Sequence, residues 1–522
     1  MNQGSYGPKW QGPVLGLLAT GAGLAAAELV VGLVQGTSSP VVPVGQVFID
    51  LVPRPLKNWA IETFGTNDKA VLVFGALIVV LGFGVTAGIL AVRGARATAY
   101  AITSVVGFLG AFAVLTRPDP TFAKLLPTLV GTSVSIAVLW YLAPRPTTSA
   151  AAHDLAEHDP TVSQTMGVDR RRFVGGAIGI GSAAVLAGGV GRMLQQRFEV
   201  SGERSSIALP APESPSNVLP ADAELAVEGL TPFVTPIKDF YRIDTALVVP
   251  QVSKDSWSLK IGGMVDNPLE ISFADLLARP QVERYVTLSC VSNPVGGGYI
   301  GNALWQGVLL KDILDEAGVQ AGATQLVSRS VDGWTAGTPT EVIMDGRDAM
   351  LAIAMNGEPL PARNGYPVRM VVPGLYGYVS ATKWVTDIEL TRWEDYDAYW
   401  IPRGWSKEGP IKTMARIDTP RRGDHVGEVA IGGVAWAIHR GVSKVQVRVD
   451  EGEWMDAELG GAPSNDTWVQ WVRRITPAPG KHVIEARAFD GDGVPQTEEY
   501  APVAPNGAQG YPRLTINIKS EG

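Results

Sequence analysis

Cys290 is the only cysteine in the 522-residue chain, and it directly follows a strand-like run, Tyr-Val-Thr-Leu-Ser, at residues 285–289. A single thiol excludes an intrachain disulfide and any zinc or iron–sulfur site built from several cysteines. Three roles remain for Cys290: a buried structural residue, a reactive nucleophile, or the one thiolate ligand of a metal centre. Composition alone favours the structural role, because free cysteine is among the most buried residue types. The sequence around Cys290 favours the metal role.

Three stretches that follow Cys290 carry a family pattern. The first is Trp-Gln-Gly-Val-Leu-Leu-Lys-Asp-Ile-Leu at 305–314, and the second runs from Met-Asn-Gly-Glu-Pro-Leu-Pro at 355–361 to Val-Val-Pro-Gly at 371–374. The third begins with Gly-Tyr at 377–378 and ends in Ala-Thr-Lys-Trp at 381–384. In order and spacing, these stretches resemble the molybdenum-cofactor domain of the sulfite oxidase family. The resemblance implies a molybdopterin-dependent oxidoreductase with an α+β catalytic domain.

The resemblance also implies a set of site residues. A pterin dithiolene supplies two sulfur ligands, and one protein thiolate completes a soft ligand set for the metal. Cys290 is therefore the expected molybdenum ligand and a catalytic residue. The phosphate and ring atoms of the pterin call for a guanidinium, an ammonium and backbone amides. The residues that the resemblance assigns to the molybdopterin are Tyr241, Arg242, Ser330, Asn364, Arg369, Ala381, Thr382 and Lys383.

Each of these assignments has a structural alternative. Arg369 and Lys383 also fit solvated charges on strands, and Asn364 followed by glycine also fits an ordinary turn. Trp305 and Trp384 are expected to fill the core. These alternatives stay open at the level of the sequence.

One departure from the family pattern concerns the substrate. Typical sulfite oxidases carry an arginine shortly after the metal-binding cysteine, where it helps to form an anion pocket. Here residues 291–295 are Val-Ser-Asn-Pro-Val, which argues against sulfite as the substrate. The loop at 399–407 offers Arg403 or Lys407 to the mouth of the pocket, because such loops commonly carry functional residues. A plain surface loop is the alternative.

The amino-terminal third contains apolar stretches of the length that crosses a membrane, about 18 residues or more. Arginines collect after the second and fourth stretches, which predicts a cytoplasmic amino terminus and an extracytoplasmic position for everything after residue 190. We therefore expect a multi-pass protein of a bacterial cell membrane. The five predicted spans of the membrane domain, residues 1–192, are 13–34, 71–92, 97–115, 125–142 and 173–190.

Asp169, Arg170, Arg171 and Arg172 precede the fifth stretch and resemble a twin-arginine signal, which directs the export of folded proteins. An extracytoplasmic molybdoenzyme needs such a route, because its cofactor is assembled in the cytoplasm. Arginines in this position also suit an ordinary stop-transfer flank.

The spans give little sign of their own redox chemistry. A transmembrane haem normally requires histidines on the spanning helices, and all five histidines lie outside the predicted spans. We expect no haem or iron–sulfur cluster in this chain, so electrons must pass to a separate partner, either a membrane redox protein or a quinone. Glu28 is the one acidic residue within a span. It fits proton or quinone chemistry, or a polar contact within the helix bundle.

The rest of the chain divides into three parts. Residues 193–222 are a predicted linker, because 201–220 is rich in serine, proline and charge. Residues 223–408 form the predicted catalytic domain. From 409 to 522, alternating segments between turn residues predict an antiparallel sandwich. Its sequence resembles the immunoglobulin-like domain that accompanies the molybdenum domain and often mediates dimerisation, so a homodimer is possible. The predicted strands are 429–436, 445–449, 469–475, 482–489 and 514–518.

The sequence thus predicts a multi-domain protein: an all-α transmembrane bundle, an α+β molybdopterin domain and an all-β carboxy-terminal domain. Its net charge of −8 argues against nucleic-acid binding. The expected function is oxygen-atom transfer on a small substrate, by reduction of an S- or N-oxide or by oxidation of a sulfur compound. A non-catalytic membrane scaffold is the alternative, and a transporter is a third hypothesis. Cys290, Arg369 and Lys383 argue against the scaffold, and the spans show no paired inverted halves.

Overall fold

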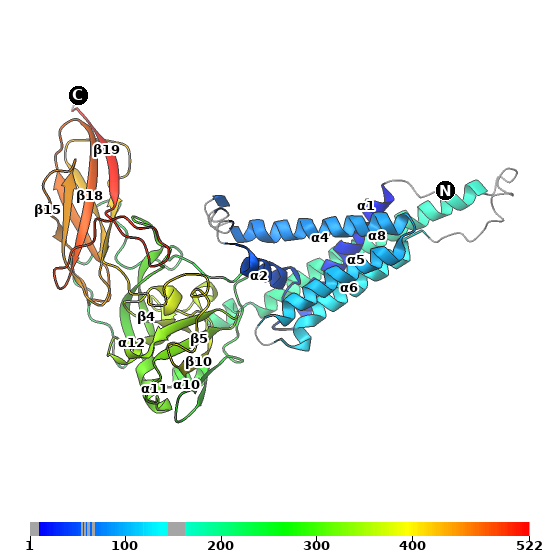
Figure 1. The fold of residues 1–522 in the computed structure, drawn as a ribbon, viewed down its shortest axis with the longest axis horizontal. Coiled ribbons are helices and arrows are strands. Elements are labelled where there is room, and N and C mark those ends of the chain that lie inside the picture. Colours follow the sequence, from blue (N-terminus) through cyan, green and yellow to red (C-terminus); the bar gives the residue numbers. More distant parts are fainter. Residues whose placement is uncertain are drawn as a thin grey trace. The chain divides into compact units, whose positions relative to one another are not determined.

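The structure is a computed structural model, and it forms two compact units (Figure 1). The first unit comprises residues 1–199 and 246–248, and the second comprises 200–245 and 249–522. The residues that the structure describes are 10–53, 56, 59, 63–64, 68–117, 120–144 and 162–520, with the backbone alone for 68 and 162–170. Two of the five histidines, His153 and His158, and the side chains of Asp169 and Arg170 lie outside the described residues.

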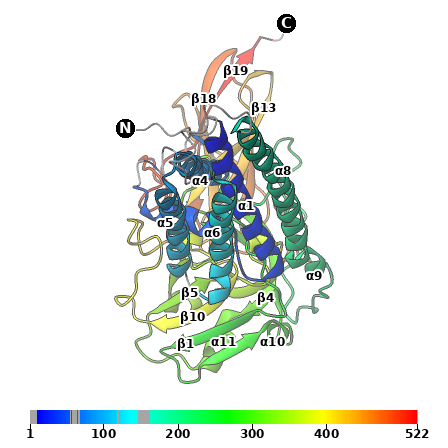
Figure 2. The same ribbon diagram turned by 90° about the vertical axis from the view of Figure 1, so that its right-hand side faces the viewer.

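The first unit is helical. Within its described residues, five helices are long and apolar enough to cross a membrane, and α2 is a shorter apolar helix. Each predicted span lies on one of the five long helices, and α8 extends beyond its predicted span at both ends. Figure 2 shows α1 packed among the others, and it contacts α4, α6 and α8. The helices are α1 (Gln11–Leu33), α2 (Val41–Leu51), α4 (Asp68–Val92), α5 (Arg96–Leu115), α6 (Phe122–Leu142) and α8 (Val162–Gln195).

Glycines allow these helices to approach closely. A Cβ atom added at Gly16 of α1 would lie 2.1 Å from the carbonyl oxygen of Gly84 on α4, and one added at Gly23 would lie 2.5 Å from that of Gly131 on α6. Small residues at helix contacts are typical of helix packing in membranes, because they bring the backbones together.

Glu28 lies on α1, and its interaction favours one of its two sequence interpretations. The side-chain amide of Gln195 on α8 donates a hydrogen bond to Glu28 Oε2 at 2.9 Å. The same amide nitrogen lies 3.3 Å from the Glu28 carbonyl oxygen. This geometry supports a polar contact that ties α1 to α8.

The first part of the second unit has two sheets, one antiparallel and one mixed. One sheet has the order β3-β4-β7-β8, with β9 paired to β7, and the other has the order β2-β1-β10-β5-β6. The strands are β1 (Ser258–Gly263), β2 (Leu269–Ser272), β3 (Val282–Ser289), β4 (Ile300–Leu309), β5 (Gln325–Ser330), β6 (Thr335–Pro339), β7 (Met350–Met355), β8 (Glu358–Pro359), β9 (Arg369–Val371) and β10 (Val385–Thr391). The helices are α10 (Phe273–Leu277), α11 (Leu310–Ala317) and α12 (Thr340–Met344). This part therefore has the α+β class that was predicted.

The carboxy-terminal part is built from strands. Its sheets have the orders β11-β13-β17-β16 and β12-β19-β18-β14-β15, and both contribute side chains to one buried cluster that includes Trp471 and Ile484. Every predicted strand is present. The strands are β11 (Met414–Thr419), β12 (Asp424–Val426), β13 (Val429–Trp436), β14 (Val442–Val449), β15 (Met455–Asp456), β16 (Glu458–Leu459), β17 (Val469–Ile475), β18 (Gly480–Asp490) and β19 (Arg513–Lys519).

The segment that was predicted as a linker is packed over much of its length. The Gln306 side chain donates a hydrogen bond to the Pro210 carbonyl oxygen at 2.6 Å, and Ser214 forms a β-bridge with Val282. Ile207 and Leu219 pack against the main core of the second unit. These apolar residues, spaced among prolines and serines, explain why the segment lies along the core of the second unit instead of acting as a free tether.

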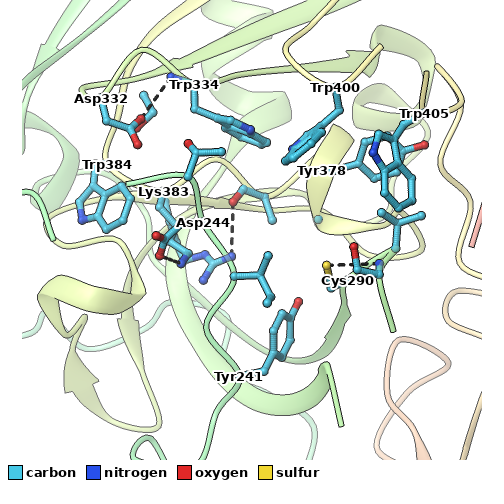
Figure 3. A pocket seen from close by; sticks show the side chains of 18 of the residues that line it. Tyr241, Asp244, Cys290, Asp332, Trp334, Tyr378, Lys383, Trp384, Trp400 and Trp405 are labelled. Atoms are coloured by element: carbon cyan, nitrogen blue, oxygen red, sulfur yellow. Dashed lines mark hydrogen bonds and ion pairs between the residues drawn. The ribbon is translucent and has the colours of Figure 1, made fainter. Parts of the chain in front are cut away.

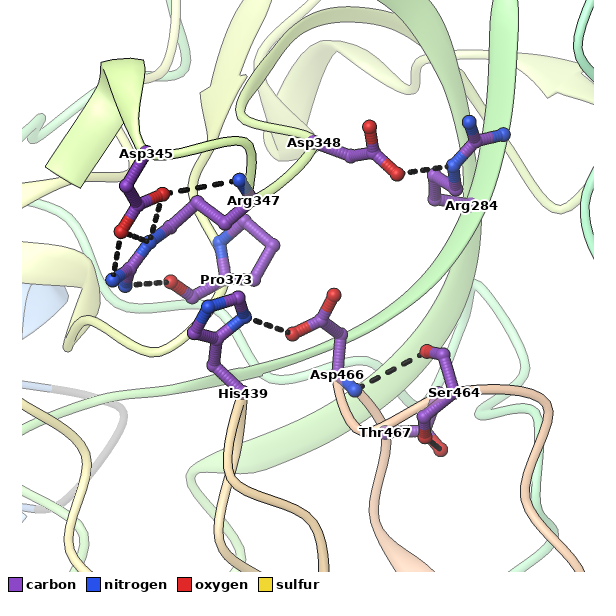
Figure 4. Close-up of polar contacts among 9 residues, drawn as sticks. All are labelled: Arg284, Asp345, Arg347, Asp348, Pro373, His439, Ser464, Asp466 and Thr467. Carbon is purple, nitrogen blue, oxygen red and sulfur yellow. Dashed lines mark hydrogen bonds and ion pairs between the residues drawn. The ribbon is translucent and has the colours of Figure 1, made fainter.

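Hydrogen bonds join the carboxy-terminal part to β3. The Trp468 backbone amide donates to Thr287 Oγ1 at 2.9 Å, and its indole nitrogen donates to the Phe233 carbonyl oxygen at 2.9 Å. Figure 4 shows the polar groups beside this junction, where His439 Nδ1 lies 3.1 Å from Asp466 Oδ1. Trp468 is fully buried, so it anchors the two parts of the unit to each other.

We expect Trp468→Ala to lower the free energy of unfolding by about 3–5 kcal/mol, because it removes a large buried side chain and the indole hydrogen bond to Phe233. Limited proteolysis should then release the carboxy-terminal part. Trp454→Ala provides the control, since this half-buried ring packs on Tyr511 within the carboxy-terminal part. Equal melting temperatures and equal proteolysis for the two variants would contradict the anchoring role.

Candidate cofactor site

Cys290 lies where β3 ends, at one wall of a cavity of about 890 Å³ that includes its open mouth (Figure 3). The pairing of β3 with β4 fixes this end, because Ser289 pairs with Ile300 and the Cys290 amide donates to the Tyr299 carbonyl oxygen at 2.9 Å. The Ser292 amide lies 3.5 Å from Cys290 Sγ. The thiol is 8% exposed, and burial raises its pKa.

Arg369 begins β9 and reaches the same cavity. It is 4% exposed, and its guanidinium donates to the carbonyl oxygens of Asn364 at 3.2 Å and Ala381 at 3.5 Å. The guanidinium also lies 5.0 Å from the centre of the Trp305 ring. Among the described residues, no carboxylate forms an ion pair with Arg369. Burial lowers its pKa to about 10, so the side chain stays charged at neutral pH.

Lys383 is the second buried cation, at the end of the loop that leads into β10. Its ammonium lies 2.9 Å from Asp244 Oδ2, and the same carboxylate receives Arg242 Nε at 2.8 Å. Burial lowers the pKa of Lys383 to about 8, against the opposing effect of Asp244. Together with Arg369, these groups leave a positive charge in this part of the site.

The structure brings six of the predicted site residues to one cavity. They come from separate elements and loops, and all line its wall: Tyr241, Cys290, Ser330, Arg369, Ala381 and Lys383. Two further predicted residues are buried behind this wall. Thr382 forms a hydroxyl hydrogen bond with Ser328 at 2.6 Å, and Asn364 is 2% exposed with its Oδ1 atom lacking a hydrogen-bond partner. Arg242 is not among the residues that line the cavity, but it forms an ion pair with Asp244, which does line it.

Arg403 is not among the residues that line the cavity. Its guanidinium lies 3.7 Å from the centre of the Tyr399 ring and donates to the Tyr399 carbonyl oxygen at 2.5 Å. This local stacking holds the side chain against its own loop. Lys407 likewise pairs with Asp397 at 2.8 Å. A role for Arg403 at the pocket mouth therefore stays a prediction.

The same loop contributes two tryptophans that the sequence interpretation missed. Trp400 and Trp405 line the cavity, with ring centres 6.2 Å apart, and Tyr378 lies 6.0 Å from Trp405. The Tyr378 hydroxyl donates to the Ser406 carbonyl oxygen at 2.6 Å. Aromatic residues are dense at 399–405, so the sequence does carry a signal for these two side chains. Asp244, Asp332 and Trp334 were also missed as lining residues.

The donor set suits a molybdenum pterin better than a metal held by protein ligands alone. Among the described residues, no group of three or more histidine, cysteine or acidic side chains is placed to hold a metal ion. Cys290 would therefore act with ligands from a cofactor. The buried Arg369 without a carboxylate suits an anionic group, and the unpartnered Asn364 oxygen suits a nearby donor. These observations fit a pterin that carries sulfur ligands, ring donors and a phosphate.

The pKa of Lys383 leads to a pH prediction for protein purified without cofactor. The folded state holds this lysine at a pKa of about 8 and the unfolded chain at its ordinary 10.5. Between these values the unfolded chain binds more protons, so stability rises with pH. We expect the melting temperature of the wild type to rise relative to that of Lys383→Met from pH 8 to pH 10. Lys311→Met, at a solvent-accessible lysine, is the control, and parallel curves for wild type and Lys383→Met would contradict the prediction.

Comparisons with known proteins agree with this geometry. Residues 246–400 match the family model described as "Oxidoreductase molybdopterin binding domain". The protein named "Uncharacterized oxidoreductase YuiH" from Bacillus subtilis is 36% identical over 153 residues, which cover 29% of this chain and 74% of that protein.

Mitochondrial sulfite oxidase from Homo sapiens is 31% identical over 336 residues, which cover 54% of this chain and 61% of that enzyme, less than two thirds of its length. Among solved structures, the sulfane dehydrogenase SoxCD from Paracoccus pantotrophus matches at 27% identity with a TM-score of 0.45, covering 52% of this chain and 75% of that chain. The matched range of this chain contains Cys290, Arg369 and Lys383. This chain belongs to the sulfite oxidase family and is a molybdopterin-binding oxidoreductase.

Proposed function

We propose that this chain is a membrane-anchored, extracytoplasmic enzyme that transfers an oxygen atom to or from a small uncharged substrate. The substrate is an S- or N-oxide that is reduced, or a sulfur compound that is oxidised. One observation carries this proposal: Cys290, two buried cations and several aromatic side chains line the same cavity.

Each part of the cavity has a role in this proposal. Cys290 provides the thiolate for molybdenum, and Arg369 and Lys383 bind the anionic part of the pterin. The bound cofactor supplies a two-electron centre that can give or take an oxygen atom. The tryptophans exclude water and position the substrate near Cys290. Asp244 holds Lys383 in place, because the two side chains form a buried ion pair at 2.9 Å.

The surroundings of Cys290 favour an uncharged substrate over sulfite. In Figure 3, Tyr378 and Trp405 lie on the same side of the cavity as Cys290, whereas Lys383 and Asp244 lie on the opposite side. Residues 291–295 contain no cation, and Arg403 is engaged with Tyr399. An anion beside Cys290 would thus meet aromatic rings, while a sulfoxide or an amine N-oxide can pack its apolar groups against them.

The test is a dye-linked assay of the purified holoenzyme with methyl phenyl sulfoxide, trimethylamine N-oxide and sulfite. We expect turnover of an oxide or of its reduced form, without turnover of sulfite. Trp405→Ala should raise KM for the aryl sulfoxide by about tenfold to a hundredfold, because burial of a ring against the wall is lost. Its effect on kcat should be smaller.

Trp393→Ala is the matched control, since Trp393 lies beside Lys407 and does not line the cavity. Turnover of sulfite alone would refute the proposed substrate class. A fully loaded protein with no turnover in either direction would instead favour the membrane scaffold.

The membrane part of the proposal draws support from the five long apolar helices and from the arginines that precede the apolar stretch of α8. We infer that the twin-arginine route exports the folded catalytic part, and that a separate redox partner exchanges electrons with it, because no histidine lies on the five helices. The carboxy-terminal part is an immunoglobulin-like sandwich in this proposal, and it suits a homodimer contact.

Export can be tested by replacing Arg171 and Arg172 with lysine. We expect this double variant to keep the catalytic part inside the cell, as measured by protease accessibility in spheroplasts, because the twin-arginine receptor reads the arginine pair and not the charge alone. Arg93→Lys, at the end of the second long helix, should leave export unchanged. Normal export of the double variant would favour the stop-transfer interpretation.

A further inference from the structure

The helical unit contains a cavity of its own, of about 780 Å³ including its open side. Residues of α1, α2, α4, α5 and α6 line it, and most of them are glycine, alanine, valine and threonine. The aromatic ring on its wall belongs to Phe83 of α4, which is 50% exposed. Small residues on several sides leave room for a flat group between the helices.

Three hydroxyl groups in this cavity are satisfied within their own helices. Thr103, Thr132 and Ser135 each donate to a carbonyl oxygen one turn earlier in their own helix, at 2.8–3.0 Å. This back-bonding satisfies a hydroxyl group inside a membrane helix. These three groups therefore need no ligand.

Thr128 of α6 is different. Its side chain is 5% exposed and lines the cavity, but its Oγ1 atom has no hydrogen-bond partner. A Cβ atom added at Gly110 of α5 would lie 3.0 Å from the Thr128 methyl group and 3.9 Å from Oγ1, so the methyl group is the part that packs on α5. An unpartnered hydroxyl group in a dry site is costly, and a ligand oxygen in the cavity would remove this cost.

We propose that this cavity binds the ring of a prenylated quinone, with the Thr128 hydroxyl donating to a ring carbonyl. A quinone ring is flat and offers carbonyl acceptors, and its prenyl tail suits the apolar helix surfaces around the opening. A lipid acyl chain fits the apolar walls equally well, but it leaves Thr128 without a partner. The proposal rests on the membrane location proposed above, and it supplies a chemical class for the separate electron partner.

The experiment uses the full-length holoenzyme in nanodiscs of quinone-free phosphatidylcholine, titrated with decylubiquinone. We expect saturable binding, and Thr128→Val should weaken it by about tenfold, since the change removes one hydrogen bond and keeps the shape of the side chain. Thr86→Val is the matched control and should bind like the wild type. Thr86 lies on α4, is exposed, donates to the Gly82 carbonyl oxygen at 2.9 Å and does not line the cavity.

A second variant, Ala76→Phe, fills the cavity from α4 and should abolish binding whatever the ligand. Equal affinity of wild type and Thr128→Val, with displacement of the quinone by decane, would identify an acyl-chain site and overturn the proposal. Molybdenum content and dye-linked activity are measured on the same samples. Wild-type protein without molybdenum and without dye-linked activity would count against the proposed enzyme function. Quinone binding reports on the cavity alone.

Discussion

The burial of two cations in one cavity is the constraint on which the catalytic part depends. Arg369 is 4% exposed, and its partners among the described residues are carbonyl oxygens and the Trp305 ring, while Lys383 shares the Asp244 carboxylate with Arg242. Burial of a charge without a full partner is strongly unfavourable. A protein that folds around such a pair is prepared for an anionic ligand, which then offsets the cost of burial. The sheets on either side hold the pair, since Arg369 begins β9 and Lys383 precedes β10.

Sequence motifs identified the site residues that lie within the motifs or directly beside them. Cys290 is placed by the end of β3, and Arg369 and Lys383 lie within the second and third family stretches. Asp244 could not be found in this way, because it meets Lys383 across 139 residues of sequence. The stacking of Arg403 on Tyr399, four residues earlier in its own loop, is likewise a contact that no motif indicates. The sequence offers no means of ranking that local contact against the pocket mouth.

The same distinction holds for the fold. The length of the apolar stretches predicted the five long helices, and the alternation of apolar and polar residues predicted the strands of the carboxy-terminal part. Both features depend on the local sequence pattern. The packed course of residues 206–220 depends on apolar side chains that meet a distant core, and composition suggested a free linker instead. The unpartnered hydroxyl of Thr128 is likewise a property of the assembled bundle, because other hydroxyls of the same residue types satisfy themselves within their helices.

We propose that Cys290 and the buried cations hold a molybdenum pterin. The metal and pterin content of protein purified from a cofactor-competent host tests this directly. Mass spectrometry would quantify molybdenum, and fluorescence after release would quantify pterin. We expect equimolar molybdenum and pterin in the wild type, pterin with a lower molybdenum content in Cys290→Ser, and loss of both in Arg369→Met. Folded wild-type protein that contains neither molybdenum nor pterin would contradict this proposal.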